Sequence, residues 1–299
     1  MAALGALTIA FSAIFVELAA VSPSTAAVFR CAYAVPLLAL LAWREDRRLG
    51  PRSRRAHVLA AVAGVFFAID LITWHHAIAD VGAGLATVLG NLQVVFVPLI
   101  AWLVLSERPG ARVAAVLPLV VVGIVLISGT LEDGAFGDDP AEGVLFGIAT
   151  GLSYAGFLLV LRAGGADLRR PAGPLFDATL VAVLASVAGG LALGELDLAP
   201  TWPGHGWLLL LAVSSQVLGW LLIASSLPRL PAAQTSLLLT LQPVGSVLLG
   251  VVLLGEEPTV VQLAGVACIL AGLIVVTRGA PQPAPPLAPA PEPTSARGR

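Results

Sequence analysis

The sequence predicts an all-α integral membrane protein whose ten transmembrane helices form two inverted five-helix repeats. Three observations support this: an apolar composition, ten apolar runs of membrane-spanning length, and an internal match between the two halves of the chain. Of the 299 residues, 58% are hydrophobic and only 11% are charged. A soluble domain carries about 25% charged residues, so the composition nearly excludes a soluble enzyme or a nucleic-acid-binding protein. The lipid bilayer is the expected partner of most of the surface.

Five apolar runs fill the first half, each bounded by Pro, Gly or charged residues. The first run lacks the basic start of a cleaved signal peptide, and the second ends at an arginine. The third follows an Arg-rich segment, the fourth ends before a Glu-Arg-Pro turn, and the fifth ends before an acidic loop. The predicted helices are Leu4–Val21, Ser24–Trp43, His57–Ile78, Gly84–Leu105 and Arg112–Ser128.

Five more runs follow the acidic loop. The sixth ends at an arginine, the seventh begins at a proline, and prolines separate the eighth from the ninth. A Gly-Glu-Glu-Pro turn separates the ninth from the tenth. These helices are predicted at Gly143–Leu161, Pro174–Leu193, Gly206–Leu227, Ala232–Leu254 and Val260–Thr277. Continuous apolar runs of ~18–23 residues favour helices over barrel strands, which alternate over about ten.

Small residues recur four apart in several of these helices. Such stripes let helix backbones approach closely in a membrane, which predicts tight packing. The stripes are Ala60, Gly64 and Ala68, then Gly143, Gly147, Gly151 and Ala155, and finally Ala264, Cys268 and Gly272.

The arginines are distributed unevenly between the predicted loops. If the N-terminus is cytoplasmic, every arginine except Arg30 lies on the cytoplasmic side, whereas residues 131–142 form an acidic loop on the other side. This positive-inside pattern predicts an even number of spans, with both termini cytoplasmic in a multi-pass protein of the inner membrane. Residues 279–299 are rich in proline and are expected to be a disordered cytoplasmic tail.

The two halves of the chain match when one is shifted by 149 residues. The shift aligns Gln93 with Gln242 and Glu107 with Glu256, along with several leucines and a proline. The repeats are therefore expected at residues 1–130 and 143–278, on either side of the acidic loop. Five helices per repeat is an odd number, so the second copy should enter the membrane inverted. Inverted repeats are typical of secondary transporters, whose substrates bind near the midplane between the copies.

The second copy resembles the EamA-type family of the drug/metabolite transporter superfamily. The resemblance rests on Pro243, the Gly-Glu-Glu-Pro-Thr run at 255–259, Gln262, Gly265 and Gly272, together with Arg30 in the first copy. It extends to about residue 278. It implies a ten-helix carrier with cytoplasmic ends that moves small metabolites, amino acids or drugs, often outward.

Charged residues inside a span are costly and by default face a cavity or a partner. Arg30 and Glu17 lie on adjacent predicted helices at similar depth. One interpretation is a structural ion pair, or an arginine that extends to the lipid headgroups. The other is that Arg30 holds a substrate carboxylate or phosphate and that Glu17 competes for it. Asp70, with Trp74 one turn later on the same face, is expected to line the cavity.

Four further residues are expected near the midplane and complete the predicted substrate site. Gln93 and Gln242 are related by the repeat, and hydrogen bonding between helices explains them as well as substrate contact does. Tyr154 and Trp220 lie at comparable depth. The predicted substrate-binding set is Arg30, Asp70, Trp74, Gln93, Tyr154, Trp220 and Gln242.

The leading functional hypothesis is a secondary-active exporter that works by alternating access on a small-molecule substrate. A uniporter or importer is the alternative within transport, and a membrane-embedded enzyme or lipid-handling protein is the alternative outside it. No phosphate loop, zinc motif or Gly-x-Ser-x-Gly occurs, so no cofactor, metal or enzymatic activity is expected. Asp70, Glu17 and His75 are the candidates for proton coupling. A homodimer is left open.

Overall fold

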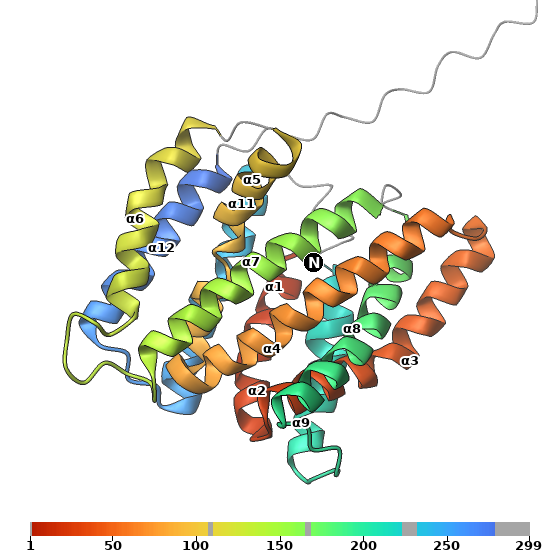
Figure 1. Ribbon diagram of the computed structural model, residues 1–299, viewed down its shortest axis with the longest axis horizontal. Coiled ribbons are helices and arrows are strands. Elements are labelled where there is room, and N and C mark those ends of the chain that lie inside the picture. Colours follow the sequence, from red (N-terminus) through yellow and green to blue (C-terminus); the bar gives the residue numbers. More distant parts are fainter. Residues whose placement is uncertain (1, 107–109, 165–168, 223–231, 279–299) are drawn as a thin grey trace, which may run out of the picture.

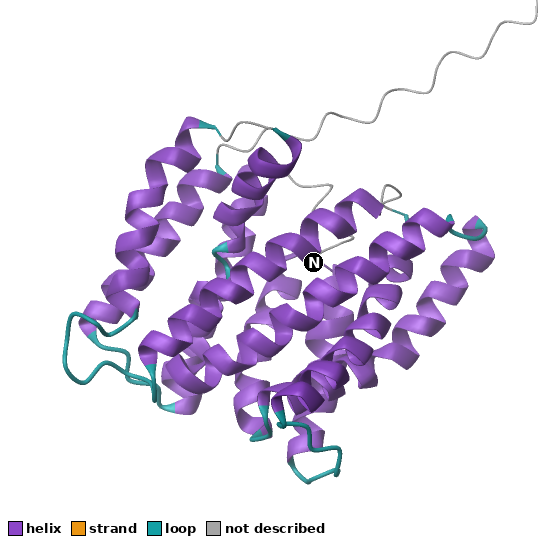
Figure 2. Cartoon of the chain, viewed as in Figure 1, coloured by secondary structure: helices purple, strands orange, loops and turns teal. Residues whose placement is uncertain are grey.

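The computed structural model describes residues 2–106, 110–164, 169–222 and 232–278, which form a bundle of helices with no strand among them (Figures 1 and 2). Six helices are long and apolar enough to cross a membrane, and four shorter apolar helices accompany them. The elements are α1 (Ala2–Ala10), α2 (Ser12–Ala19), α3 (Pro23–Leu49), α4 (Arg54–Gly90), α5 (Gln93–Leu105), α6 (Ala111–Ile127), α7 (Pro140–Gly164), α8 (Ala172–Leu193), α9 (Gly204–Leu211), η1 (Ala212–Gly219), α11 (Ala232–Leu249), η3 (Gly250–Leu254) and α12 (Val260–Thr277).

The prediction of ten apolar helices is confirmed, and several of them are divided into shorter pieces. The first predicted span is α1 followed by α2, with the break at Phe11. The eighth begins as α9 and continues as the π-helical segment η1, and the ninth is α11 followed by π-helical η3. The predicted end of the eighth span, the turn containing Glu107 and the proline-rich tail lie outside the described residues.

The third and fourth predicted spans meet within α4. This helix runs on from Arg54 to Gly90, but Gly82 interrupts it with φ +84° and ψ 165°. A positive φ is costly for any residue with a Cβ, so glycine suits this bend. We call residues 54–81 the first arm of α4 and residues 83–90 its second arm. The predicted boundary between the two spans was therefore correct in place, although the chain bends there without forming a loop.

Polar caps begin several helices. The Ser22 side chain caps α3, whose first residue is a proline, and the Ser53 side chain caps α4. At α12, Thr259 and Gln262 form a reciprocal capping box. Each cap satisfies backbone N–H groups that have no partner within the helix. Such groups are especially costly near a bilayer, so the caps help to fix where these helices begin.

The predicted small-residue stripes pack against neighbouring helices. A Cβ added to Gly147 would fall 2.5 Å from the Cβ of Leu89, and one added to Gly64 would collide with the Ala178 carbonyl on α8. In the stripe on α12, a Cβ added to Gly272 would fall 2.9 Å from the side chain of Val120 on α6. These contacts confirm the close approach predicted for the helix backbones.

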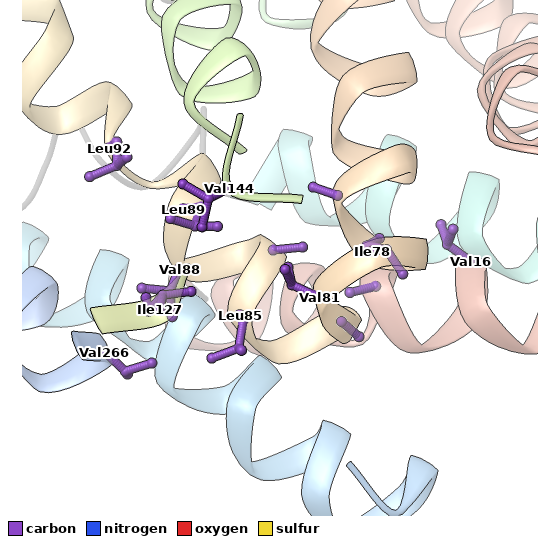
Figure 3. Close-up of a cluster of buried hydrophobic side chains, with 14 of the residues drawn as sticks. Val16, Ile78, Val81, Leu85, Val88, Leu89, Leu92, Ile127, Val144 and Val266 are labelled. Atoms are coloured by element: carbon purple, nitrogen blue, oxygen red, sulfur yellow. The ribbon is translucent and has the colours of Figure 1, made fainter. Parts of the chain in front are cut away.

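The largest apolar cluster surrounds the second arm of α4. Leu85, Leu89 and Leu92 are at most 1% exposed and pack with Val144 of α7 and Ile127 of α6 (Figure 3). Because lipid is as apolar as these side chains, the close van der Waals contact is the main energetic gain from this packing. The cluster fixes the second arm of α4 against helices from both halves of the chain.

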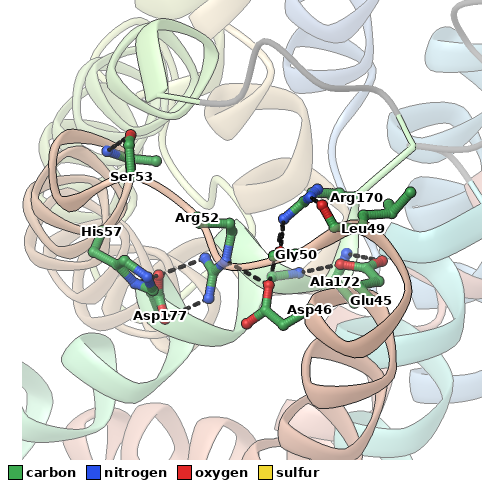
Figure 4. A network of polar contacts seen from close by, with 12 residues as sticks. Glu45, Asp46, Leu49, Gly50, Arg52, Ser53, His57, Arg170, Ala172 and Asp177 are labelled. Atoms are coloured by element: carbon green, nitrogen blue, oxygen red, sulfur yellow. Dashed lines mark hydrogen bonds and ion pairs between the residues drawn. The ribbon is translucent and has the colours of Figure 1, made fainter.

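Ion pairs and caps join the two halves at one end of the bundle, which we call the Arg-rich end. Arg52 makes a bidentate contact with Asp177 of α8, at 2.6 and 3.2 Å, and His57 Nδ1 lies 2.7 Å from the same carboxylate (Figure 4). Glu45 accepts hydrogen bonds from the backbone N–H groups of Ala172 and Gly173, and so caps α8. The start of α8, in the second half, is thus held by side chains of the first half.

Candidate functional site

A partly open cavity lies between helices of both halves. Its polar lining comes mainly from α3, α4, α7 and α11, and its apolar lining includes several aromatic rings. The residues that line it are Ile9, Ser12, Arg30, Phe67, Asp70, Leu71, Trp74, Thr87, Gly90, Asn91, Thr150, Tyr154, Trp220 and Gln242. A mostly apolar cavity with a few convergent polar groups is typical of a small-molecule site.

Arg30 is 5% exposed, and its described partners are neutral. Its Nη1 lies 3.4 Å from His75 Nε2, and its Nη2 donates to Gln216 Oε1 at 3.3 Å. Its Nε is buried and has no hydrogen-bond partner. The guanidinium carbon lies 5.6 Å from the centre of a Trp74 ring. Most of the hydrogen-bonding capacity of this cation is therefore unused by the described residues.

Asp70 faces the same cavity from α4 and is 7% exposed. Within the described residues, its carboxylate has neither a hydrogen-bond donor nor an ion-pair partner, and no nitrogen of Arg30 comes within 4.0 Å of it. A buried carboxylate normally has at least one such partner. The cavity thus contains one cation and one anion that are buried but not paired with each other.

Two residues outside the lining hold Arg30 in place. His75 Nδ1 lies 2.9 Å from the Pro23 carbonyl oxygen, which only accepts hydrogen bonds, so Nδ1 carries the proton and Nε2 accepts from Arg30. Gln216 is fully buried in η1, and its Nε2 donates to Thr179 Oγ1 at 3.4 Å, which directs Oε1 toward Arg30. The π-helical turn of η1 therefore places a positioning side chain behind the guanidinium.

An aromatic cluster forms one wall. The Tyr154 and Trp220 rings meet edge to face at 6.1 Å, and both pack on Phe157, which stacks on Phe67 at 4.7 Å. Such contacts make the wall rigid and apolar. Trp74 lies beside Arg30, so the aromatic lining reaches the charged part of the cavity.

Six of the seven residues in the predicted substrate-binding set line this one cavity: Arg30, Asp70, Trp74, Tyr154, Trp220 and Gln242. Gln93 does not. It is the first residue of α5, just after the break at Gly90–Leu92, and it lies near Gly151 of α7. Sequence reasoning did not select Thr87 or Thr150, because isolated threonines in apolar helices carry no distinguishing pattern.

The alternative of a Glu17–Arg30 ion pair is not observed. Glu17 is exposed and lines a second cavity with Gly82, Asp138 and Glu256 at the opposite end of the bundle from the Arg-rich end. We call this end the acidic end. His75 contacts Arg30 directly, whereas His76 lies 3.3 Å from Glu195. Of the three residues expected to couple protons, Asp70 lines the first cavity, His75 contacts Arg30, and Glu17 lines the second cavity.

Glu256 orders the bend of α4. Its carboxylate accepts hydrogen bonds from the N–H groups of Ala83 at 2.5 Å and Gly84 at 3.1 Å, the first residues of the second arm. Burial raises the pKa of Glu256, the two backbone hydrogen bonds partly oppose this shift, and nearby Glu17 adds to it. A carboxylate at a helix N-terminus also interacts favourably with the helix dipole. One half of the chain thus caps a helix of the other.

The chain matches one family model over nearly its whole length and is similar to two curated proteins and to one solved structure. The sequence model of the EamA-like transporter family matches residues 1–129 and 141–278. "Uncharacterized transporter YwfM" of Bacillus subtilis is 25% identical over 75% of this chain and 77% of its own length, and "Uncharacterized protein PA1977" of Pseudomonas aeruginosa is 30% identical over 70% and 71%. One solved structure, described only as the crystal structure of a protein, has a TM-score of 0.58 at 17% identity and covers 93% of this chain and 97% of its own. This likeness shows a shared fold.

Proposed function

Since the chain belongs to the EamA-like transporter family and is a multi-pass membrane transporter, we propose that it is a secondary carrier that exports a small metabolite by alternating access. The observation that carries this proposal is the central cavity, in which buried Arg30 and Asp70 lack charged partners among the described residues. Holding unpaired charges in a cavity is costly, and a substrate that neutralises them accounts for their presence.

We further propose that the two halves are inverted repeats that move against each other. In this scheme the helices of the first half correspond, in order, to those of the second half. The pairs are α1 and α2 with α7, α3 with α8, the first arm of α4 with α9 and η1, the second arm of α4 and α5 with α11 and η3, and α6 with α12. The helix contacts support it because they occur in related pairs. The second arm of α4 contacts α7 where Leu89 meets Gly147, as α11 packs on α1. The first arm contacts α8 where Gly64 meets Ala178, as η1 packs on α3.

The proposed orientation places the Arg-rich end and both termini in the cytoplasm, in the inner membrane of the cell. The Arg-rich end carries the α3–α4 segment, with Arg44, Arg47, Arg48, Arg52, Arg54 and Arg55. The loop between α6 and α7 at the opposite end carries Glu132, Asp133, Asp138 and Asp139 without a basic residue. This asymmetry is the basis of the positive-inside rule.

Proton exchange is the proposed energy source, with Asp70 as the exchanging group. Asp70 is buried and faces the cavity, so a proton and a cationic group of the substrate would compete for one carboxylate. If Asp70 releases the substrate and binds a proton when the cavity opens outward, and does the reverse when it opens inward, export of substrate is coupled to proton entry.

Transport into proteoliposomes with an imposed pH gradient tests the proposal. We expect wild type to accumulate at least one solute of a broad radiolabelled metabolite panel, and Asp70→Asn to lose gradient-driven accumulation. Asp133→Asn, in the exposed α6–α7 loop, is the matched control and should behave as wild type. If no solute crosses, the carrier proposal is wrong. An Asp70→Asn variant that still concentrates solute would remove Asp70 from coupling.

A further inference from the structure

We propose that the central cavity selects zwitterions that carry an ammonium and a carboxylate near an apolar side chain, with Arg30 binding the carboxylate and Asp70 binding the ammonium. This inference rests on the proposed carrier function and specifies its substrate class. Its basis is the combination of two opposite buried charges, held apart, with an aromatic wall between helices of both halves.

While Asp70 is ionised, the charge balance disfavours simpler ligands. An anion alone would satisfy Arg30 but would leave Asp70 buried without a partner and repelled by the ligand. A cation alone would satisfy Asp70 but would leave Arg30 buried without a charged partner and repelled by the ligand. A zwitterion neutralises both charges at once and has no net charge, so moving it with the cavity adds no charge to the protein interior. Because an unpaired buried charge is costly, the cavity should bind a zwitterion much more tightly than a ligand with a single charge.

Arg30 is arranged for a carboxylate. A guanidinium offers five N–H donors in a planar fork that fits two carboxylate oxygens. The described contacts use one nitrogen toward His75 and one toward Gln216, both at 3.3–3.4 Å, which is long for bonds from a charged donor. Both partners are neutral acceptors, so they orient the guanidinium and leave its charge uncompensated. A bound carboxylate would provide that compensation.

Asp70 and the rings near it are arranged for an ammonium group. The carboxylate has no described donor, and a primary ammonium brings three. Trp74 lies one helical turn after Asp70 on the same face, and the face of an indole ring also attracts cations. The ammonium would thus contact a carboxylate and lie close to an aromatic ring, whereas a second anion would meet repulsion from both.

The rest of the wall accommodates the third substituent. Phe67, Tyr154 and Trp220 are aromatic, and Leu71 is aliphatic. The neutral polar groups nearby belong to Ser12, Thr87, Asn91, Thr150 and Gln242. A side chain that is aliphatic or aromatic would be covered by this wall, whereas a third charge would find no opposite charge among the described lining residues. The predicted class is therefore amino acids with uncharged side chains or their close analogues.

The test is a binding comparison on the purified full-length protein in nanodiscs, measured by calorimetry, because the neutral forms of small amines and acids cross vesicle membranes unaided. The probes are L-alanine, L-leucine and L-phenylalanine, each compared with the acid that lacks its amino group and the amine that lacks its carboxylate. We expect at least one zwitterion to bind about tenfold or more tightly than both of its analogues, the ratio expected when a single buried charge contact is lost.

Two variants make the test specific to each charge. Asp70→Asn should lose zwitterion affinity while affinity for the deaminated acid is kept or increased. Arg30→Gln should show the opposite pattern and keep the amine. Retained binding of one analogue class shows that each variant is folded. Asp133→Asn should preserve the wild-type order of affinities for the zwitterion, the acid and the amine.

Each other outcome contradicts the inference in a distinguishable way. If the acid analogue binds wild type as tightly as the zwitterion, the cavity is an anion site and Asp70 does not contact the ligand. If no zwitterion binds but the metabolite panel yields another transported solute, the substrate class is wrong and the carrier function stands. If nothing binds and no solute crosses, the proposed function itself fails.

Discussion

At the scale of single residues, the orientation of Arg30 depends on neutral side chains behind it. Gln216 accepts from the guanidinium and donates to Thr179, so its amide has a defined direction. His75 is fixed in one tautomer by the Pro23 carbonyl. Neither side chain lines the cavity in the described residues, so both are expected to act on the substrate through Arg30.

Replacing Gln216 with Leu should weaken substrate binding about tenfold, because a hydrogen bond to a charged group contributes roughly 1.5 kcal/mol or more. Maximal transport rate at saturating substrate should change less than affinity. The measurement is concentration-dependent uptake in proteoliposomes. Leu218→Ala, on the exposed face of the same π-helical segment, should leave affinity unchanged. Equal losses in both variants would indicate a general defect of η1 rather than misplacement of Arg30.

Glu256 predicts a pH-dependent contribution to stability. Its pKa is raised in the folded protein, so the native state holds this proton more tightly than the unfolded state does. As pH rises from the ordinary glutamate value, about 4.5, through the raised value, ionisation of Glu256 costs more in the folded state and stability falls. Glu256→Gln lacks this ionisation, so its stability relative to wild type should improve across that pH range.

Thermal unfolding in detergent between pH 4 and pH 8 measures this difference. At low pH the protonated Glu256 and the Gln side chain each offer one carbonyl oxygen to the backbone N–H groups, so the variant should start close to wild type in stability. Glu257→Gln, beside it in sequence and exposed, should show no such trend. A constant difference between wild type and Glu256→Gln at every pH would contradict the raised pKa.

At the scale of elements, the bend of α4 depends on both the backbone of Gly82 and the space around it. A Cβ at this position would lie 2.8 Å from Glu256 Oε1 and 2.8 Å from Phe136. Gly194, which ends α8 with φ +70°, has a similarly positive φ, but a Cβ there would have no neighbouring atom within 4 Å. A comparison of alanine substitutions at the two glycines therefore separates the cost of backbone strain from the cost of steric crowding.

We expect Gly194→Ala to lower stability by about 1–2 kcal/mol, the cost of a left-handed conformation for a residue with a Cβ. Gly82→Ala should cost more, and it should also reduce transport because the second arm carries Thr87 and Gly90 of the cavity lining. Denaturant unfolding in mixed micelles and uptake assays measure the two effects. Similar losses of stability in both variants would show that the contacts with Glu256 and Phe136 adapt freely.

The sequence predicted the number and order of the helices because apolar length and helix-ending residues are local properties. It also predicted that Arg30, Asp70 and Trp74 face a cavity, since a charged side chain within a span is too costly to face lipid. It could neither place Gln93 outside the lining nor decide between the interpretations of Glu17 and Arg30, because the rotation of each helix about its axis depends on packing partners far away in the chain. Gln93 follows a helix break that no residue pattern marks, and Arg30 turns toward His75 and Gln216.

At the scale of the whole molecule, the orientation in the membrane predicts which loops can be labelled. In a background with Cys31 and Cys268 replaced by Ala, a cysteine at Asp133 should react with an impermeant maleimide on intact cells. A cysteine at Arg54 should react only after the membrane is permeabilised. Both positions are exposed, unlike Arg52, whose side chain is 6% exposed in its contact with Asp177. Labelling of Arg54→Cys in intact cells would reverse the proposed topology.

The network at the Arg-rich end also constrains how the protein is made. Arg52 pairs with Asp177, which lies 125 residues later in the chain, and Glu45 caps a helix that begins only at Ala172. At a synthesis rate of about 5–20 residues per second, α3 and the segment that joins it to α4 wait roughly 6–25 s for these partners. During that interval their charged ends must be accommodated by water, lipid headgroups or the insertion machinery. Synthesis of α8 is therefore the step at which the α3–α4 segment acquires these charged partners, and truncation before it should leave that segment exposed to membrane quality control.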